Sequence, residues 1–341
     1  MRGGRVVGEG YHRRAGGPHA EAVALAAAGS RARGADLYVS LEPCNHRGRT
    51  PPCVEAIARA GIARVVVALG DPNPHVAGGG MAALKRRGIP VARGDRARAE
   101  RAARQNEKFL TWARTGRPFV LLKWAATLDG RIAAADGGSR WITGERARRR
   151  ARLLREEYDA VLVGAGTVLA DDPLLTRRLS RNRAPHLRIV LDGRLRVPEH
   201  ARMLRDPSGV LIVTARRADA RKRARLFRRG IEVWELPADS SGRIPIRTLV
   251  ERLGDRGVTS VLVEGGSETH GSFLAAGVAD RVCAFVAPRI LGGTNAPAAV
   301  GGRGFPLSRT PLLSDVEIER LGEDVMLSGR VAPDRASRSR R

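Results

Sequence analysis

Several features that mark particular classes of protein are scarce in this chain of 341 residues. Only three cysteines occur, Cys44, Cys53 and Cys283, which is too few for a disulfide framework and is an odd number. No apolar run reaches the ~18 residues that span a bilayer, and no apolar signal-peptide core follows Met1. These absences predict a cytoplasmic protein with no membrane partner.

Acidic residues are also in the minority, and this imbalance has two interpretations. The chain has 61 lysines and arginines against 35 aspartates and glutamates, a net charge of +26, which favours a nucleic-acid-binding protein. However, only four of the basic residues are lysine, and arginine, alanine and glycine are enriched together, as in GC-rich genomes. The basic residues are also spread along the chain. We therefore expect no nucleic-acid partner, although a positive surface attracts phosphorylated substrates.

Short apolar runs alternate with helical patterns along the chain. Such alternation predicts α/β architecture with a mostly parallel sheet. The runs that read as buried strands are 36–40, 64–69, 119–123, 160–164, 188–192, 210–214, 231–236, 260–264 and 281–286. The helical patterns are 19–28, 53–60, 80–87, 96–114, 145–156, 216–229, 246–256 and 269–276.

The chain is long enough for two domains, since a domain has about 100–200 residues. The segment 115–118, Thr-Gly-Arg-Pro, follows a long helical pattern and precedes a new strand, so its glycine and proline indicate a linker. We expect one domain over residues 1–114 and a second over residues 119–331. The polar, Ser- and Arg-rich end, 332–341, is expected to be a disordered tail.

The strongest chemical motif is His19-Ala-Glu21, followed by Pro-Cys44 and then by Cys53. A catalytic zinc takes three protein ligands and keeps a fourth position for water, and one histidine with two cysteines supplies such a set. Glu21, two residues after His19 at a helix start, can act on that water as general acid and base, as in zinc deaminases. Each part alone is common, since Glu21 could simply favour the helix dipole. All parts in this order predict a zinc deaminase.

The spacing of the cysteines narrows the class of deaminase. Eight residues separate Cys44 from Cys53, whereas nucleoside and nucleic-acid deaminases commonly have two. The stretches 17–21, 41–53 and 71–78 closely resemble the pyrimidine deaminase of riboflavin biosynthesis. The resemblance implies a cytidine-deaminase-like three-layer domain that binds one Zn²⁺ per chain through His19, Cys44 and Cys53.

By the same resemblance, the loop inserted between the cysteines contacts the ribose phosphate of the substrate. His46 and Arg49 fall on substrate-contacting positions, and an arginine fork suits a phosphate. His12, with Arg13, falls on the segment beside them, although His12 could be an ordinary surface histidine. The family has a further helix and strand before the position of Met1, including an asparagine that binds substrate. We therefore expect either a misassigned start or an impaired deaminase.

Most of the remaining chain resembles the dihydrofolate-reductase-like reductase of the same family. The matching stretches are 123–131, 139–144, 163–173, 190–192, 263–266 and 287–293. The resemblance implies NADPH as cofactor. The residues themselves agree, because 164–167 and 264–267 place glycines at the carboxyl ends of two strands, where open α/β sheets bind ligands. Tight turns explain each glycine pair about as well as ligand binding does. Because no G-x-G-x-x-G fingerprint follows the first strand of this domain, we do not expect a standard Rossmann domain.

The resemblance assigns two sets of residues in this second domain. Arg155 and Arg178 are candidate phosphate partners that could also be solvated arginines. His270 stands where the family has an apolar or small residue, and Asp171 is the first carboxylate to consider as proton donor. Cys283 lies in an apolar strand as a core residue. The NADPH-contacting positions are Ala125, Trp141, Thr167, Asp171, Gly193, Gly266, Ser267, Glu268, Thr269, His270, Gly271 and Ser272. The substrate-contacting positions are Ser139, Arg155, Asp171, Leu175, Arg178 and Glu264.

The resulting hypothesis is a bifunctional, homo-oligomeric enzyme of riboflavin biosynthesis. Zinc-dependent hydrolysis would deaminate 2,5-diamino-6-(5-phosphoribosylamino)pyrimidin-4(3H)-one, and NADPH would then reduce its ribosyl group to ribityl by hydride transfer to C1′. Three alternatives stay open. They are a nucleic-acid deaminase with an accessory domain, a binding or regulatory protein with a degenerate deaminase fold, and a reductase whose first half is an impaired deaminase.

Overall fold

The computed structural model describes residues 1–13, 16–48, 50–73, 79–177, 186–215, 218–239 and 243–332. The chain forms two compact units, Met1–Thr115 and Gly116–Arg341, and the division falls within the segment 115–118 that the sequence indicates as a linker. The expected tail lies outside the described residues from position 333 onward.

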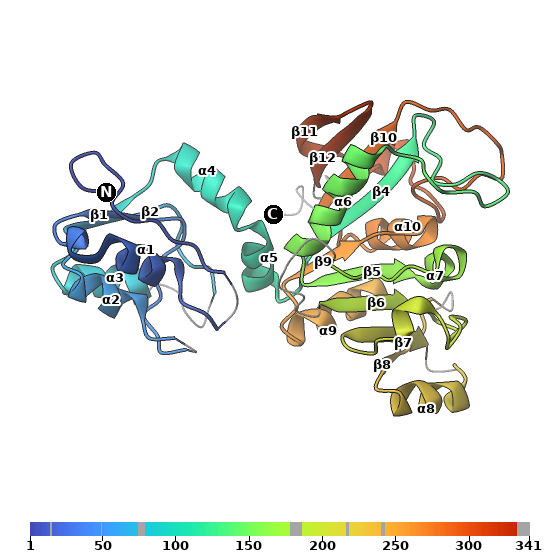
Figure 1. Ribbon diagram of the computed structural model, residues 1–341, viewed down its shortest axis with the longest axis horizontal. Coiled ribbons are helices and arrows are strands. Elements are labelled where there is room, and N and C mark those ends of the chain that lie inside the picture. The colour runs from blue at the N-terminus through green and yellow to red at the C-terminus, as the bar shows by residue number, and fades with distance from the viewer. Residues whose placement is uncertain are drawn as a thin grey trace. The chain divides into compact units, whose positions relative to one another are not determined.

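A parallel sheet of three strands forms the centre of the first unit (Figure 1). Its strands lie in the order β1 (Asp36–Val39), β2 (Arg64–Val67) and β3 (Val91–Arg93). Three helices, α1 (Ala20–Ala28), α2 (Cys53–Arg59) and α3 (Gly79–Arg86), accompany the sheet, with a short 3-10 helix η1 (Gly29–Ala32). Ala28, Ile57 and Leu84 bring one apolar side chain from each helix into a core with Val65 of β2. Through this packing, all three helices share one core with the sheet.

The sequence predicts one helix over 96–114, and this prediction is wrong. The structure has α4 (Arg96–Gln105) and α5 (Glu107–Thr115), separated by Asn106. Asn106 has φ −106° and ψ 14°, and its side-chain Nδ2 donates to the carbonyl oxygen of Ala102 at 2.8 Å. A side chain that bonds to the local backbone competes with helical pairing, so the helix ends at this asparagine.

A nine-stranded sheet runs through the second unit in the order β11-β12-β10-β4-β9-β5-β6-β7-β8 (Figure 1). The seven strands from β10 to β8 pair in parallel, and only β12 and β11 add antiparallel pairs. The mostly parallel sheet predicted from the sequence is therefore confirmed. The strands are β4 (Phe119–Thr127), β5 (Ala160–Gly164), β6 (Leu187–Leu191), β7 (Val210–Ala215), β8 (Glu232–Leu236), β9 (Ser260–Val263), β10 (Arg281–Ala287), β11 (Leu313–Leu321) and β12 (Asp324–Val331).

Helices cover both faces of this sheet, and each face has its own core. Leu154, Val168 and Leu226 bring α6, α7 and α8 into one core, whereas Leu249 and Phe273 bring α9 and α10 into the other. Because both faces are covered, the strands read as continuous apolar runs without alternation. The helices are α6 (Glu145–Glu157), α7 (Ala165–Asp171), α8 (Ala220–Arg228), α9 (Ile246–Asp255) and α10 (Ser267–Ala275), with short 3-10 helices η2 (Arg202–Leu204) and η3 (Leu307–Arg309).

Three strands and one α-helix of the described structure are absent from the sequence-based prediction. Strand β3 has three residues, and β11 is exposed along most of its length, so neither shows an apolar run. Strand β12 lies between β10 and the edge strand β11. Helix α7 begins at Ala165, inside a glycine-containing stretch whose sequence is typical of a turn. Within the described part of the chain, no helix has the length and hydropathy needed to cross a membrane.

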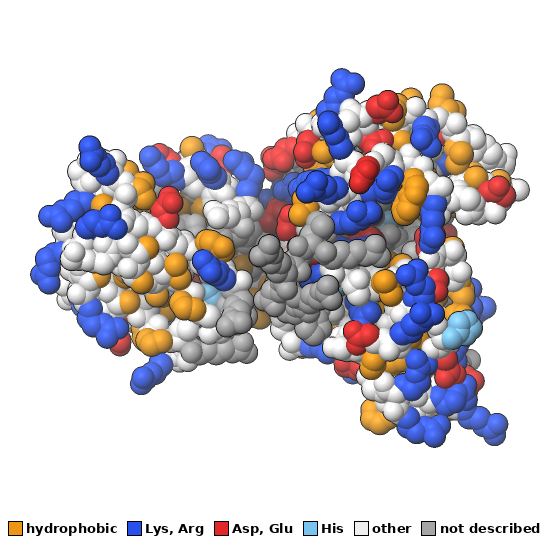
Figure 2. All heavy atoms as spheres, viewed as in Figure 1, with side chains coloured by type: hydrophobic (Ala, Val, Ile, Leu, Met, Phe, Trp, Pro, Cys, Tyr) orange, Lys and Arg blue, Asp and Glu red, His pale blue; other side chains and the backbone are white. Residues whose placement is uncertain are grey.

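Basic side chains are distributed over the surface and interspersed with acidic ones (Figure 2). Around α8, arginines form ion pairs with carboxylates: Arg223 with Glu235 at 2.8 Å and Arg225 with Glu199 at 2.9 Å. The high net charge therefore does not translate into one continuous basic patch on the visible face.

Candidate active sites

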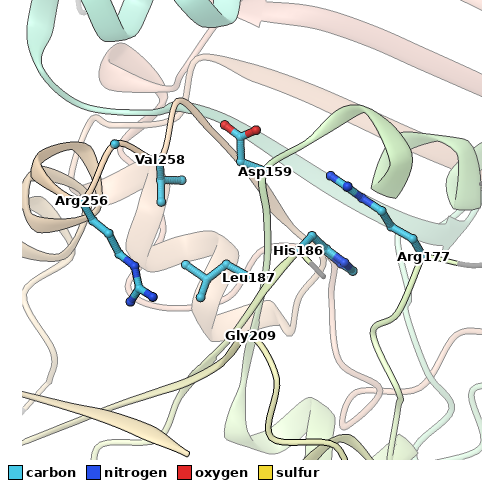
Figure 3. Close-up of a pocket in the computed structure, with 8 residues that line it drawn as sticks. Asp159, Arg177, His186, Leu187, Gly209, Arg256 and Val258 are labelled. Carbon is cyan, nitrogen blue, oxygen red and sulfur yellow. The ribbon is translucent and has the colours of Figure 1, made fainter. Parts of the chain in front are cut away.

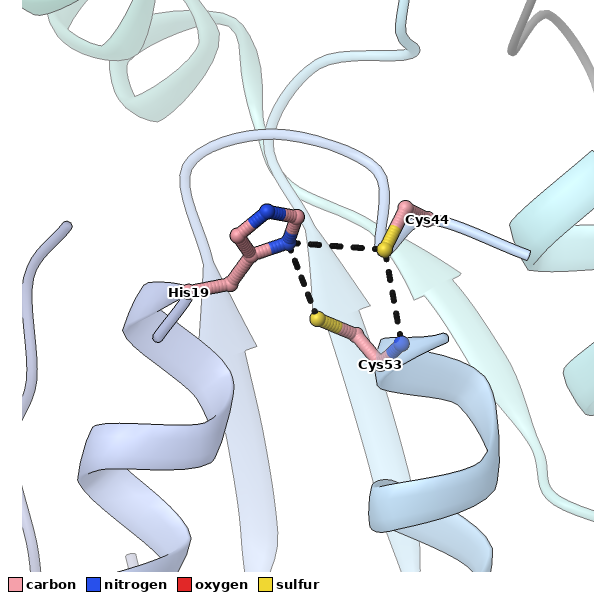
Figure 4. A group of neighbouring side chains, drawn as sticks. All are labelled: His19, Cys44 and Cys53. Atoms are coloured by element: carbon pink, nitrogen blue, oxygen red, sulfur yellow. Dashed lines mark hydrogen bonds between the residues drawn. The ribbon is translucent and has the colours of Figure 1, made fainter. Parts of the chain in front are cut away.

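Three metal-ligating side chains meet in the first unit (Figure 4). His19 is the N-cap of α1, Cys53 is the first residue of α2, and Cys44 lies in the loop after β1. The Nδ1 atom of His19 is 3.4 Å from Sγ of Cys44 and 3.3 Å from Sγ of Cys53. All three ligand atoms lie within 4.8 Å of one another.

This donor set fits zinc. A tetrahedral zinc with bonds of about 2.3 Å to sulfur and about 2.1 Å to nitrogen separates its ligand atoms by roughly 3.5 Å. The hydrogen bond between the two cysteines lowers the pKa of the Cys44 thiol and raises that of Cys53, so Cys44 loses its proton more readily than a free cysteine does. A thiolate is the form that binds metal.

Glu21 lies beside this group, in the first turn of α1, with 9% of its surface exposed. Burial, the largest effect, raises the pKa of its carboxyl, and the charge of Cys44 raises it further, against the opposing influence of His19. The carboxyl therefore accepts a proton more readily than an exposed glutamate would. This property suits a general acid and base.

Two further side chains restrain His19. The ring of His12 meets it edge-on, with centroids 5.3 Å apart and planes at 89°, while Nδ1 of His12 is 3.0 Å from the carbonyl oxygen of Pro18. On the other side, Oγ1 of Thr50 is 3.3 Å from Nε2 of His19. Sequence reasoning assigns Thr50 no role, because its partner is distant in sequence.

The inserted loop and its flanks are only partly described. His46 and Arg13 are exposed, and the guanidinium group of Arg13 lies 5.5 Å from the ring centroid of Tyr11. Arg49 lies outside the described residues.

Glu42 anchors the loop that carries Cys44, a role that the sequence motif does not reveal. It is 5% exposed, and its carboxylate accepts hydrogen bonds from the backbone N–H groups of Met81, at 2.9 Å, and Asp71, at 3.3 Å. These bonds connect the Cys44 loop to α3 and to the segment after β2.

A cavity of about 530 Å³ opens at the carboxyl ends of β4, β9 and β5 in the second unit. This is the edge at which open α/β sheets bind ligands. The residues that the resemblance assigns and that line it are Ala125, Ser139, Trp141, Arg155, Thr167, Asp171, Leu175, Glu264, Gly266 and His270. Arg178 lies outside the described residues. Gly193, Ser267, Glu268, Thr269, Gly271 and Ser272 are described but are not part of the cavity wall.

A buried cluster of charges forms one wall of the cavity. Parallel pairing places Lys123 of β4 beside Glu264 at the end of β9, with Nζ 3.5 Å from Oε2. From α6, Arg155 donates to both carboxylate oxygens of Glu264, with Nη2 2.8 Å from Oε2. Burial alone would raise the pKa of Glu264, but the charges of Arg155 and Lys123 outweigh it and lower the pKa to about 2. Arg155 thus compensates a buried carboxylate, an interaction that its expected role as a phosphate partner does not include.

A second group of polar side chains that line the cavity surrounds Asp171. Ser139 donates to Oδ1 of Asp171 at 3.2 Å, and Arg140 donates to its backbone oxygen at 2.6 Å. Trp141 is 60% exposed, and the guanidinium carbon of Arg148 lies 4.6 Å from its ring centroid. The arginines that line this cavity without having been assigned from the sequence are Arg140, Arg148, Arg152 and Arg202.

The first turn of α7, which follows β5, comes close to the turn between β9 and α10. A Cβ atom on Gly266 would lie 3.3 Å from Oγ1 of Thr167, so glycine keeps this turn narrow. Gly266 is the N-cap of α10, and its first turn has no side-chain cap among the described residues. His270 is 1% exposed, its Nδ1 is 2.9 Å from the carbonyl oxygen of Ala299, and its ring packs on Trp124. A phosphate group suits the free N–H groups of such a helix start.

A second cavity, of about 440 Å³, lies at the amino ends of β5, β6 and β7 (Figure 3). Its polar side chains make hydrogen bonds that connect neighbouring segments of the fold. Arg177 donates to the carbonyl oxygens of Arg155 and Tyr158, and Asp159 accepts from the backbone and hydroxyl groups of Thr259. Burial, assisted by Arg177, lowers the pKa of His186 to about 4, so this histidine is neutral near pH 7.

Two family models match the chain. A model of the cytidine and deoxycytidylate deaminase zinc-binding region matches residues 1–69, which contain the His19, Cys44 and Cys53 group. A model of the RibD C-terminal domain matches residues 118–327.

Whole-chain comparisons agree with both matches. The riboflavin biosynthesis protein RibD of Bacillus amyloliquefaciens is 45% identical over 326 residues, 95% of this chain and 86% of that protein. The structure of Acinetobacter baumannii RibD, form 1, has a TM-score of 0.85 at 38% identity and covers 96% of this chain and 89% of its own. A diaminohydroxyphosphoribosylaminopyrimidine deaminase/5-amino-6-(5-phosphoribosylamino)uracil reductase from Thermotoga maritima has a TM-score of 0.83 at 36% identity. The match covers 97% of this chain and 90% of that protein.

These matches confirm the expected fold, a cytidine-deaminase-like domain followed by a dihydrofolate-reductase-like domain. They also confirm the resemblance inferred from the cysteine spacing and the glycine-containing motifs. The chain therefore belongs to the RibD family of riboflavin biosynthesis, whose members join a deaminase to a reductase.

Proposed function

We propose that this chain catalyses two consecutive steps on phosphorylated pyrimidines. The first is the hydrolytic deamination of 2,5-diamino-6-(5-phosphoribosylamino)pyrimidin-4(3H)-one, and the second is the NADPH-dependent reduction of the ribosyl group of its product to ribityl. The observation that carries the proposal is the group of one nitrogen and two sulfur ligand atoms within 4.8 Å of one another, beside the buried Glu21. The activities in the name of the Thermotoga relative support it.

In the deaminase, His19, Cys44 and Cys53 would hold one Zn²⁺. When bound, this ion would act as a Lewis acid that activates water for attack on the amino-bearing carbon of the substrate. Glu21 moves the proton. Its carboxylate takes a proton from the attacking water and delivers it to the departing amine, so that ammonia leaves. The raised pKa of Glu21 supports both transfers, because burial favours the protonated carboxyl group that carries the proton between them. His12, His46 and Arg49 are proposed to contact the substrate around this group.

In the reductase, NADPH supplies a hydride when bound. The close approach of Thr167, on α7, to Gly266, with the N–H groups at the start of α10, suits the phosphates of a dinucleotide. Ser139, Asp171 and Leu175, which also line the cavity, are proposed to orient the substrate.

Lys123 is the proton donor that the cavity supports best. Its Nζ lies 3.5 Å from Glu264 with the side chain 15% exposed, so a charged ammonium group is held at the cavity wall. Asp171 instead accepts a hydrogen bond from Ser139, and its side chain is 38% exposed. Lys123 would protonate the substrate atom that becomes electron-rich as C1′ receives the hydride.

The proton donor can be tested with two substitutions. We expect Lys123→Met to lower the turnover of the deaminated substrate by about 10²-fold or more, as for loss of a general acid. NADPH binding, measured by fluorescence, should persist. Asp171→Asn, which can still accept the hydrogen bond from Ser139, should lower the turnover less than Lys123→Met does. The reverse pattern would return the role to Asp171.

The proposed function is tested by assaying each half with its own substrate. Purified protein should contain one zinc per chain and release ammonia from the diaminopyrimidine substrate, and it should oxidise NADPH with the deaminated product. Reduction without ammonia release would leave a reductase with an impaired deaminase. Absence of zinc and of both activities would leave a binding protein.

A further inference from the structure

We propose that Thr50 is a positioning residue that fixes the orientation and the tautomer of the zinc ligand His19. This inference rests on the proposed zinc site and extends it beyond the three ligands. It starts from the two ring nitrogens of His19, which face different partners. Nδ1 lies 3.4 Å and 3.3 Å from the two cysteine sulfurs, whereas Nε2 lies 3.3 Å from the hydroxyl oxygen of Thr50.

The partners of the ring determine which nitrogen carries hydrogen. A histidine binds a metal through a lone pair, so the nitrogen that faces the thiols, Nδ1, must be unprotonated in the metal complex. A neutral imidazole then carries its hydrogen on Nε2. This N–H points at Thr50, which accepts it through Oγ1. A hydrogen bond of this kind orients the ring and makes it a stronger ligand.

The connection between Thr50 and the metal group is short and stiff. Thr50 is followed by Pro51 and Pro52, and Cys53 comes next as a ligand and the first residue of α2. Each proline fixes its own φ angle, and Thr50 is restricted to extended backbone because a proline follows it. Pro52 accordingly has φ −58° and ψ 132°. The hydroxyl partner of one ligand and the thiol of another thus lie on one rigid tetrapeptide.

This connection gives the inserted loop a function besides contacting substrate. A two-residue spacing between cysteines would have no room for a hydroxyl upstream of two prolines. The longer insertion, 45–52, contains His46 and ends on the segment that holds His19 in place. We infer that the loop completes the metal centre through Thr50.

The test is zinc affinity, measured on the full chain by competition with a chromogenic chelator. Thr50→Val removes the hydroxyl at nearly constant volume, and we expect it to bind zinc about 10–100-fold more weakly, as for loss of other outer partners of metal-bound histidines. Thr50→Ser restores the hydroxyl and should bind within a few-fold of the original chain. Thr50→Ala, a second variant without the hydroxyl, should repeat the loss. Thr111→Val, on α5 of the same unit, is the matched control and should have no effect.

Cobalt(II) distinguishes a positioning role from general destabilisation. The visible absorption of Co²⁺ bound to nitrogen and sulfur ligands reports their geometry, and we expect Thr50→Val and Thr50→Ala to change this spectrum while Thr50→Ser leaves it unchanged. Equal zinc affinity and identical cobalt spectra in all variants would overturn the inference while leaving the zinc site intact. Failure of the original chain to bind either metal would instead contradict the proposed function.

Discussion

Glu21 combines a buried carboxyl with a position next to the metal ligands, and this combination can be tested at one atom. Glu21→Gln keeps the size and polarity of the side chain but removes its ability to transfer a proton. We expect ammonia release to fall by about 10²–10⁴-fold, the usual contribution of a general acid and base. Zinc content, measured by atomic absorption, should stay the same, because Glu21 is outside the ligand group. Undiminished ammonia release would exclude Glu21 as the proton carrier.

His186 predicts how the second unit responds to acid. Burial is the main cause that lowers its pKa from 6.5 to about 4, so the folded chain binds its proton less readily than the unfolded chain. The stability that follows from neutral His186 is present above pH 6.5 and is lost as the pH falls from about 6.5 to about 4. The loss amounts to up to about 3 kcal/mol.

The measurement is the unfolding temperature of the full chain and of His186→Gln between about pH 8 and about pH 4. The original chain should lose more stability than the variant over this range, and the two curves should run parallel above pH 7. Parallel curves over the whole range would show that His186 titrates normally.

Single residues also show which parts of the sites were open to prediction. His19, Cys44 and Cys53 could be grouped from the sequence because their chemical types and order are distinctive. Thr50 and Lys123 could not, since a hydroxyl or an ammonium group acquires its role from a partner that only folding brings near. Arg155 illustrates the same limit, because its partner Glu264 is 109 residues away.

Among the secondary-structure elements, α3 and the Cys44 loop are in unusually close contact. A Cβ atom on Gly80 would lie 1.8 Å from the carbonyl oxygen of Pro43, the residue before Cys44. Gly80→Ala must therefore displace this loop, and we expect weaker zinc binding and a lower unfolding temperature of the first unit. The measurements are chelator competition and calorimetry.

Gly79→Ala is the matched control on the same helix. A Cβ atom on Gly79 would have its nearest contact at 3.5 Å, with Cβ of Asn45, which is ordinary van der Waals distance. Because alanine favours a helix over glycine by about 1 kcal/mol, this variant should be as stable as the original chain or more so. If both variants kept full zinc affinity, α3 would not be what holds the Cys44 loop.

The strands that the sequence predicts most clearly are those buried on both faces of the sheet. Strands β5, β7 and β9 are almost wholly apolar because helices cover them on each side. Strand β11 escaped prediction because it is exposed and mixes Ser, Asp, Glu and Arg with its apolar residues. The break between α4 and α5 depends on one asparagine side chain, which a helical pattern averaged over many residues does not detect.

At the scale of the whole molecule, the central feature is a metal-ligand group in one compact unit and a cavity of about 530 Å³ in the other. Each unit has its own hydrophobic core, so a substitution in one site should leave the chemistry of the other unchanged. The product of the first site is the substrate proposed for the second. One chain should therefore convert the diaminopyrimidine to the ribityl product without another enzyme.

The most direct measurement follows NADPH oxidation and ammonia release together, starting from the diaminopyrimidine substrate and zinc-loaded protein. We expect one ammonia for each NADPH oxidised. Glu21→Gln should abolish both signals, and supplying the deaminated substrate to this variant should restore NADPH oxidation. NADPH oxidation without ammonia, or silence with the deaminated substrate, would contradict the two-step account.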